Sequence, residues 1–240
     1  MHEWIQMFRP WLLVCVAAIE ELASSPRVYQ VDDFLTSQEC DLLREHGEPG
    51  LEASLTIDRV SGQLVPNPVR SSMQMYVSLK DSLEHPLIRV LVRRLYQLAR
   101  MPLGHGERLQ IGRYRVGEKY DCHFDSEPQQ DILRTATIIV YLADVLGGET
   151  LFPMGADCHI LNECCNVTEA ASQMMWIQPK KGRAVLFFSH DLNSELNPNA
   201  VHCSCPVIQG EKWILQAWFR SQLYADSPHN PSLSEDFAEL

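Results

Sequence analysis

A series of short, strand-like runs fills the chain after Pro102, and this series restricts the possible folds more than any other feature. The runs are rich in β-branched and aromatic residues, and turn residues separate them. They read RLQIGRYRV, KYDCHFD, RTATIIVYLA, ETLF, RAVLFF, AVHCSC and KWILQAWFR. Such a succession, with no long helical pattern inside it, predicts an antiparallel barrel or sandwich of about eight strands.

Helical signals come before this region. Thr36 can act as the N-cap of a helix that ends at Gly47. Residues 85–98 carry apolar side chains at helical spacing, with a proline in the first turn. Residues 28–34 alternate like a short strand, and residues 51–67 are polar with Gly and Pro, which predicts a long loop or a loose hairpin. The expected plan is therefore helices first and strands after them.

The N-terminus carries an apolar run at residues 11–19. This run is shorter than the ~20 apolar residues that a bilayer-spanning helix needs, so we expect no stable membrane span. Two interpretations stay open: a signal or anchor segment, and a helix packed on the domain. We divide the chain into an N-terminal apolar segment at residues 1–24, one domain at residues 25–226 with its barrel core at about 107–221, and a polar acidic tail at residues 227–240.

The charge of the chain limits its partners. The 240 residues have a formal net charge of -11 at pH 7. A nucleic-acid-binding surface needs clustered Lys and Arg to neutralise phosphates, and the sequence has no such cluster, so we expect no nucleic-acid partner. An acidic face would suit a neutral or basic polypeptide, although a solvated face without a partner is favoured.

The cysteines bear on the compartment. Cys164 and Cys165 lie in an irregular insert at residues 154–173, and Cys205 follows much later. We predict a disulfide between Cys205 and either Cys164 or Cys165 if the protein is secreted. With a glycosylation sequon at residues 166–168, this favours the endoplasmic reticulum or secretory pathway, with the cytoplasm as the alternative. The eight cysteines are Cys15, Cys40, Cys122, Cys158, Cys164, Cys165, Cys203 and Cys205.

One triplet suggests a metal site. His123 and Asp125 are two residues apart in a strand-like run, so their side chains can share one face and converge on one ion. His202 lies in another strand-like run. Two histidines and one carboxylate on separate strands are the ligand set of non-haem Fe(II) oxygenases, and they leave positions open for co-substrate and oxygen.

Lys212 follows His202 across a turn. A lysine that points inward is costly to bury unless an anion pairs with it, and the distal carboxylate of 2-oxoglutarate is such an anion. The competing interpretation is structural zinc held by the histidines and cysteines, but the paired CxxC spacings typical of zinc sites are absent.

Several ordered blocks resemble the catalytic domain of prolyl 4-hydroxylases. They are ERLQIGRYRVGEKYDCHFD, RTATIIVYLADVLGGETLFP, PKKGRAVLFF and VHCSCPVIQGEKWILQAWFR, with VYQVDDFLTSQEC and the triplet at residues 70–72 before them. The resemblance implies a double-stranded β-helix (jelly-roll) barrel with N-terminal helices packed on one face. It also implies hydroxylation of peptidyl proline to 4-hydroxyproline, with conversion of 2-oxoglutarate and O2 to succinate and CO2. The implied cofactors are Fe(II), 2-oxoglutarate and L-ascorbate, and the implied partner is a proline-rich polypeptide.

The same resemblance implies roles for individual residues. His123, Asp125 and His202 would bind iron, and Lys212 would bind 2-oxoglutarate together with Tyr114 and Thr150. The substrate would be bound in a groove lined by Glu107, Tyr120, Arg134 and Trp218, and a flexible loop containing Arg70 and Ser71 would close over the peptide.

Other interpretations of these residues stay open. The tyrosines could be ordinary strand residues, Glu107 and Arg134 a surface ion pair, and Trp218 core packing. Cys203 is less usual beside His202, where its thiol could be oxidised or form a disulfide. The other functions considered are a lysyl or small-molecule hydroxylase and a non-catalytic peptide-binding protein.

Overall fold

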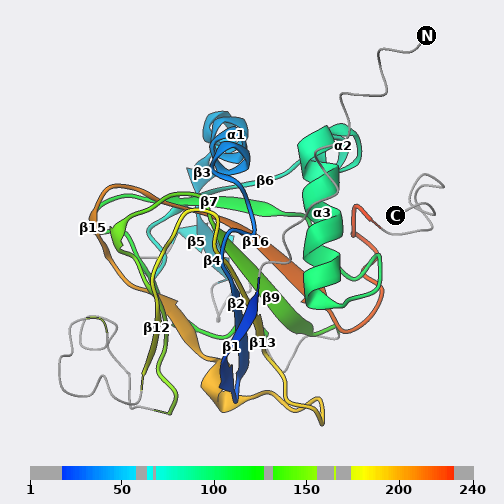
Figure 1. The fold of residues 1–240 in the computed structure, drawn as a ribbon, viewed down its shortest axis with the longest axis vertical. Coiled ribbons are helices and arrows are strands. Elements are labelled where there is room, and N and C mark those ends of the chain that lie inside the picture. The colour runs from blue at the N-terminus through cyan, green and yellow to red at the C-terminus, as the bar shows by residue number, and fades with distance from the viewer. Residues whose placement is uncertain are drawn as a thin grey trace.

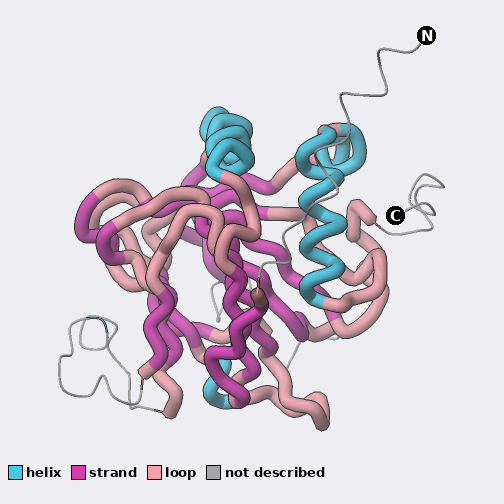
Figure 2. The backbone as a smooth tube through the Cα atoms, viewed as in Figure 1, coloured by secondary structure: helices cyan, strands magenta, loops and turns pink. Residues whose placement is uncertain are grey.

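The computed structural model describes residues 18–57, 64–66, 69–126, 132–155, 165 and 174–229. Strands form the centre of this part of the chain, and the longer helices lie outside them (Figures 1 and 2). The helices are α1 (Ser37–Gly47), α2 (Leu79–Glu84) and α3 (Pro86–Ala99), with short 3-10 turns at Glu48–Gly50 and Pro198–Ala200. The strands are β1 (Ile19–Ser24), β2 (Arg27–Val31), β3 (Glu52–Ala53), β4 (Leu55–Ile57), β5 (Leu64–Pro66), β6 (Met73–Tyr76), β7 (Gln110–Tyr114), β8 (Tyr120–His123), β9 (Arg134–Tyr141), β10 (Leu146–Gly147), β11 (Thr150–Phe152), β12 (Met175–Ile177), β13 (Ala184–Phe188), β14 (His202–Ser204), β15 (Val207–Gln209) and β16 (Lys212–Arg220).

Two antiparallel sheets organise these strands. The larger sheet has eight strands in the order β1-β2-β13-β9-β16-β7-β6-β3, and the smaller has four in the order β12-β11-β14-β8. Two further pairs, β10 with β15 and β4 with β5, are short. The prediction of a mainly antiparallel β fold is confirmed. In the described residues the pairings give separate sheets rather than one closed barrel.

Strand alternation separates the core into two layers. In β16, Leu215 and Phe219 lie in one buried cluster with Leu91 and Leu95 of α3, whereas Ile214 lies in a second cluster. Successive side chains of a strand point to opposite faces, so one face of the larger sheet is covered by helices and the other is free to meet the smaller sheet. The second cluster joins β9 and β13 to β11 and β12 through Tyr141, Phe187, Phe152 and Ile177, among others.

Local signals in the sequence explain the two longer helices. Thr36 caps α1 with a reciprocal capping box, in which its hydroxyl accepts from the Glu39 N–H and its own N–H donates to the Glu39 carboxylate. The same carboxylate is paired with Arg94 of α3, which ties the two helices together. Helix α3 starts at Pro86, one residue after the predicted start, and both helices match their predicted ranges closely.

One predicted boundary near the N-terminus differs from the structure. Residues 19–24, assigned to the N-terminal apolar segment, form β1, because their backbone pairs with β2 and so extends the larger sheet. The segment at residues 51–67 contains the β4–β5 hairpin, which agrees with one of the two interpretations left open. Residues 1–17, which include most of the apolar run, lie outside the described residues. Within the described residues, no helix combines the length and the apolar character that crossing a membrane requires.

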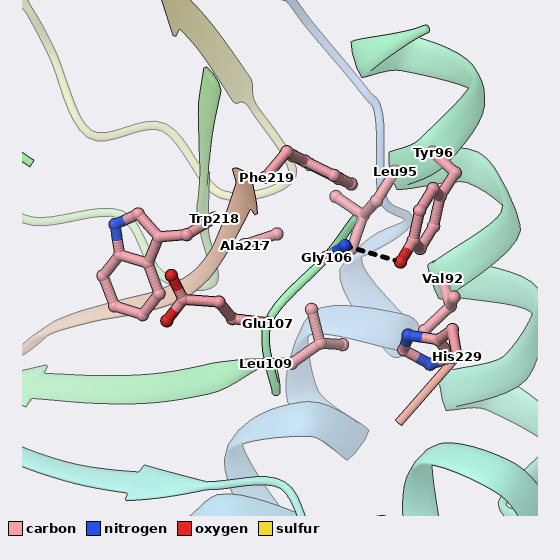
Figure 3. A pocket seen from close by; sticks show the side chains of 10 residues that line it. All are labelled: Val92, Leu95, Tyr96, Gly106, Glu107, Leu109, Ala217, Trp218, Phe219 and His229. Atoms are coloured by element: carbon pink, nitrogen blue, oxygen red, sulfur yellow. Dashed lines mark hydrogen bonds between the residues drawn. The ribbon is translucent and has the colours of Figure 1, made fainter. Parts of the chain in front are cut away.

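The start of the predicted C-terminal tail is also part of the core. Ser227 and His229 are buried, and the imidazole of His229 packs edge-on against the Tyr96 ring of α3 at a centroid distance of 5.7 Å. Beside it, the Tyr96 hydroxyl accepts a hydrogen bond of 2.8 Å from the Gly106 N–H (Figure 3). Residues 227–229 of the predicted tail are therefore buried, and His229 lines a small pocket between α3 and the larger sheet. Residues 230–240 lie outside the described residues.

Candidate metal and anion centre

The smaller sheet brings three potential metal ligands together. His123 ends β8 and His202 begins β14, and the two residues are directly opposite one another in the antiparallel register. Asp125 follows β8 and turns its carboxylate between the two rings. Its Oδ1 lies 3.7 Å from Nε2 of His123, and its Oδ2 lies 3.7 Å from Nε2 of His202. One ligand atom from each residue lies within 4.8 Å of the others, so a single ion can be bound by all three.

The hydrogen bonds of the histidines leave the correct nitrogens available. Nδ1 of His123 is 2.8 Å from the Asp121 carbonyl oxygen, and Nδ1 of His202 is 3.1 Å from the Ala200 carbonyl oxygen. A carbonyl oxygen only accepts, so each Nδ1 carries the proton and each Nε2 keeps its lone pair for a metal. Nε2 of His202 is buried and has no hydrogen-bond partner among the described residues.

The charges of the three groups also suit a cation. Burial and the nearby His202 lower the pKa of His123 to about 3, so its ring is neutral at physiological pH. Burial alone would raise the pKa of Asp125, but nearby positive charge, including that of Arg134, lowers it, so its carboxylate is ionised. Two neutral imidazoles and one carboxylate are the donor set of mononuclear Fe(II) oxygenases, and the residues therefore fit that metal.

Thr137 is a contact of this site that the sequence analysis missed. It is fully buried in β9, and its hydroxyl donates a hydrogen bond of 2.6 Å to Oδ2 of Asp125. Its alternation with the core residues of β9 could have shown that it points between the sheets. Its partner depends on how the larger sheet faces Asp125, which the sequence does not show.

A buried ammonium lies beside β14, the strand that carries the potential metal ligand His202. Lys212 begins β16 and is only 1% exposed, and its Nζ donates a hydrogen bond of 2.7 Å to the Ser204 hydroxyl. The ammonium also lies 5.3 Å from the Tyr114 ring centroid and 5.7 Å from that of Tyr141. Burial lowers the pKa of Lys212 to about 7. No carboxylate of the described residues forms an ion pair with it, so the surroundings of this ammonium fit a bound anion.

Another hydroxyl group, that of Thr150, lies on the strand next to Ser204. Thr150 is opposite Ser204 in the β11–β14 register, and its hydroxyl accepts a 2.6 Å hydrogen bond from Tyr141. The structure therefore brings the predicted residues Tyr114, Thr150 and Lys212 to one region. Ser204 was missed, although it is two residues after His202 and so shares its face of β14.

The predicted groove residues form two groups. In the first, the Tyr120 ring stacks on the His123 ring at a centroid distance of 3.7 Å, and the Arg70 guanidinium lies 4.9 Å from the Tyr120 ring. Arg70 is buried and is held by Ser72 and Gln110 through hydrogen bonds of 3.1 and 2.9 Å. This group places an aromatic ring and a cation directly beside one metal ligand.

Ser71 is the exposed member of this first group. Its backbone N–H donates to the Lys119 carbonyl oxygen at 3.2 Å, and its hydroxyl accepts from the Lys119 N–H at 3.0 Å. These bonds connect the segment around Ser71 to the loop that leads into β8.

The second group is centred on Glu107. Arg134 donates two hydrogen bonds to the Glu107 carboxylate, at 2.6 and 2.8 Å, and Arg220 lies 2.7 Å from the same carboxylate. The Arg134 guanidinium also lies 4.4 Å from the Trp218 ring. Glu107 is mostly buried, so this is not a surface ion pair. Trp218 and Glu107 point away from α3, whereas Phe219 points toward it (Figure 3). Nε1 of Trp218 is buried without a hydrogen-bond partner among the described residues.

Comparisons with known proteins agree with this geometry. A family model described as the 2OG-Fe(II) oxygenase superfamily matches residues 109–220. The chain is 35% identical over 206 residues to the probable prolyl 4-hydroxylase 7 of Arabidopsis thaliana, covering 83% of this chain and 64% of that protein. It thus spans just under two thirds of that relative. It is 32% identical over 209 residues to prolyl 4-hydroxylase 1 of the same plant, covering 85% of this chain and 72% of that protein.

A solved structure is similar as well. It is the viral collagen prolyl hydroxylase of Paramecium Bursaria Chlorella virus-1 in complex with 2-oxoglutarate. The TM-score is 0.60 with 25% sequence identity, and the match covers 81% of this chain and 96% of that chain. This similarity confirms the predicted fold class.

Proposed function

The chain belongs to the prolyl 4-hydroxylase family of the 2-oxoglutarate- and Fe(II)-dependent oxygenases, and from this premise we propose that it hydroxylates peptidyl proline to 4-hydroxyproline. The proposed co-substrates are 2-oxoglutarate and O2, with succinate and CO2 as the other products, and L-ascorbate is the proposed auxiliary reductant. The observation that carries the proposal is the convergence of His123, Asp125 and His202 beside a buried ammonium without a carboxylate partner among the described residues.

In this proposal His123, Asp125 and His202 hold the iron. The metal, when bound together with 2-oxoglutarate, supplies the activation of O2 that hydroxylation of an unactivated C–H bond requires. The protein contributes the positions of its own atoms. The two Nδ1 protons, fixed on backbone carbonyls, keep both Nε2 atoms aimed at the ion, and Thr137 fixes the Asp125 carboxylate.

Lys212 is the proposed partner of the distal carboxylate of 2-oxoglutarate. Its ammonium can form a charge-assisted hydrogen bond to that carboxylate, and burial strengthens the bond because water does not compete. Ser204, Thr150 and Tyr114 supply hydroxyls around the same carboxylate. Lys212→Ala should remove about 3–5 kcal/mol of 2-oxoglutarate binding while leaving metal binding intact. Unchanged binding of 2-oxoglutarate to this variant would contradict the assignment.

The two groove groups support a proline-rich substrate. Proline has no N–H, so a peptide must be recognised through its rings and its carbonyl oxygens. Tyr120 offers a partly exposed aromatic ring beside His123, with the Arg70 guanidinium next to it. Trp218 is buried, and its ring supports the Arg134 guanidinium. An extended polyproline II peptide is already ordered and therefore loses little entropy when it docks on such a surface.

An oxidising compartment is the proposed location, with the endoplasmic reticulum and secretory pathway as the specific expectation. Two disulfides, Cys122–Cys203 and Cys165–Cys205, support it, since disulfides are rare in reducing compartments. Cys165–Cys205 is one of the two pairings that the sequence left open for Cys205. Cys158, Cys164 and the sequon at residues 166–168 lie outside the described residues.

The deciding experiment follows two products. Purified protein is incubated with Fe(II), ascorbate, 2-oxoglutarate and a panel of proline-rich peptides, and both succinate and peptide mass are measured. We expect a gain of one oxygen atom on proline, lost in His123→Ala and reduced in Tyr120→Ala and Arg134→Ala, but not in the exposed Arg115→Ala control. Succinate without modified proline would reassign the protein to a lysyl or small-molecule hydroxylase. Neither product with metal-loaded protein would favour a non-catalytic peptide-binding protein.

A further inference from the structure

A disulfide joins the two strands that carry the metal ligands. Cys122 directly precedes His123 on β8, and Cys203 directly follows His202 on β14. Because the two histidines are opposite one another, the two cysteines are neighbours as well, with a Cα–Cα distance of 4.3 Å. Alternation along each strand places the cysteines on the opposite face from the imidazoles. The bridge therefore lies behind the metal site.

The face of the smaller sheet behind the metal site is closely packed and mostly buried. Cys203 is 1% exposed and lies in a cluster with Leu151 and Cys205, against which Met174 and Trp176 also pack. Cys122 is only partly buried. A reductant can therefore reach the bridge from the Cys122 side, while the Cys203 sulfur is shielded.

Backbone pairing alone holds β8 weakly. This strand has four residues and lies at the edge of the smaller sheet, where β14 is its neighbour. The pairing of β8 with β14 is interrupted by a register irregularity between His202 and Ser204. On the other side, β8 is held by the segment at residues 69–71 through an isolated bridge and two backbone hydrogen bonds. Asp125 comes after the strand has ended, so its position depends on where β8 ends.

We propose that the Cys122–Cys203 disulfide is a positioning element of the metal centre. By fixing the spacing of β8 and β14, it holds His123 and Asp125 at the distance from His202 that one ion requires. Reduction by a dithiol supplies two electrons and two protons, gives two thiols and leaves the dithiol as its own disulfide. The reduced protein then binds the metal more weakly. This inference rests on the proposed function because it needs the metal site.

A general stabilising role is the rival explanation, and the second disulfide separates the two. Cys165–Cys205 packs in the same cluster and is attached just beyond the end of β14. It joins neither β8 nor Asp125, and Cys165 belongs to no strand. If the first bridge acted only through stability, removal of either bridge would affect metal binding similarly. If the Cys122–Cys203 bridge acts by positioning the ligands, only removal of that bridge would weaken metal binding.

The experiment measures binding of Co(II) to the purified full-length chain without oxygen, by calorimetry and by the Co(II) absorption spectrum. The proteins are wild type, Cys122→Ala/Cys203→Ala, Cys165→Ala/Cys205→Ala and His123→Ala, with folding checked by circular dichroism. We expect the Co(II) dissociation constant to rise about tenfold or more in Cys122→Ala/Cys203→Ala. It should change less than twofold in the control pair. Wild type that has been reduced with a dithiol and desalted without oxygen should show the same loss of Co(II) affinity. The same treatment should cause no further loss of Co(II) affinity in Cys122→Ala/Cys203→Ala.

Unchanged Co(II) affinity in folded Cys122→Ala/Cys203→Ala would overturn the inference, and so would an equal loss in both disulfide variants. If that variant does not fold, the comparison of oxidised and reduced wild type decides the question in the same way. The His123→Ala variant tests the metal site itself. If His123→Ala binds Co(II) as tightly as wild type, both the proposed metal site and this inference fail.

Discussion

Lys212 shows how burial can make a single residue sensitive to pH. In the free protein its pKa is lowered to about 7, so the amine loses its charge as the pH rises through neutrality. A bound carboxylate favours the ammonium form, and binding above this pH must therefore take up a proton. We expect the dissociation constant of 2-oxoglutarate to be nearly constant below neutral pH and to rise by about tenfold per pH unit above it. Calorimetry on Ni(II)-loaded protein at several pH values would measure this.

Lys212→Arg is the matched control for this pH dependence. A guanidinium does not titrate in this range, although its planar shape fits the site less well. The variant should bind 2-oxoglutarate more weakly than wild type, with little change between pH 6 and pH 9. The same slope in Lys212→Arg would show that another group causes the pH dependence.

Thr137 can be tested by nearly isosteric changes. Thr137→Val keeps the shape of the side chain but removes the hydroxyl that donates to Asp125. We expect metal affinity to fall by about 10–100-fold, as is typical when a group that orients a ligand is lost. Thr137→Ser keeps the donor and should retain most of the affinity. A Co(II) titration measures both variants, and equal affinities in Thr137→Val and wild type would refute this role.

The residues that the sequence predicted differ in kind from those it missed. His123 and Asp125 were found because alternation within one strand puts them on one face, a relation that is local in the chain. Thr137 and Ser204 were missed because their partners depend on strand register and on how the sheets face one another. The Cys122–Cys203 pairing was missed for the same reason, since it follows from the register that opposes the two histidines.

At the scale of elements, α1 depends on its capping box. Thr36→Ala removes the hydroxyl that accepts from the Glu39 N–H. We expect the free energy of unfolding to fall by about 1 kcal/mol, the usual effect of losing such a cap. Urea unfolding would measure the change, with the exposed neighbour Ser37→Ala as the control. An equal loss in both variants would mean that the cap contributes nothing specific.

The elements that the sequence predicted well are those with internal signals. Helices α1 and α3 have a cap, a starting proline or a regular apolar face, all of which lie within the helix. Strand β1 has none of these, since its sequence is mixed and acidic, and its pairing is supplied by β2. The burial of residues 227–229 likewise depends on contacts with distant elements, such as that of His229 with Tyr96 of α3.

At the scale of the whole molecule, the two faces of the larger sheet have different roles. The helix-covered face of the larger sheet contains much of the apolar core. The opposite face meets the smaller sheet, and there Thr137 and Lys212 from the larger sheet meet Asp125 and Ser204 from the region of the smaller one. The site therefore exists only when both sheets are in place. Global unfolding should therefore destroy the site, and the stability of the fold sets how readily this happens.

That stability should depend on both disulfides. They span sequence separations of 81 and 40 residues, and in the chain-entropy model each contributes on the order of 4 kcal/mol. The two loops overlap in sequence, so after one bridge is formed the other closes a shorter effective loop. Each single removal from wild type therefore costs less than the bridge would contribute alone, so we expect the loss of unfolding free energy on removing both bridges to be larger than the sum of the two separate losses. Equilibrium urea unfolding of wild type, the two double-alanine variants and the variant with all four changes would measure this.

The four-alanine variant also reports any effect of reductant on other cysteines. A reductant-induced loss of the same size in that variant and in wild type would show that these two bridges do not stabilise the fold.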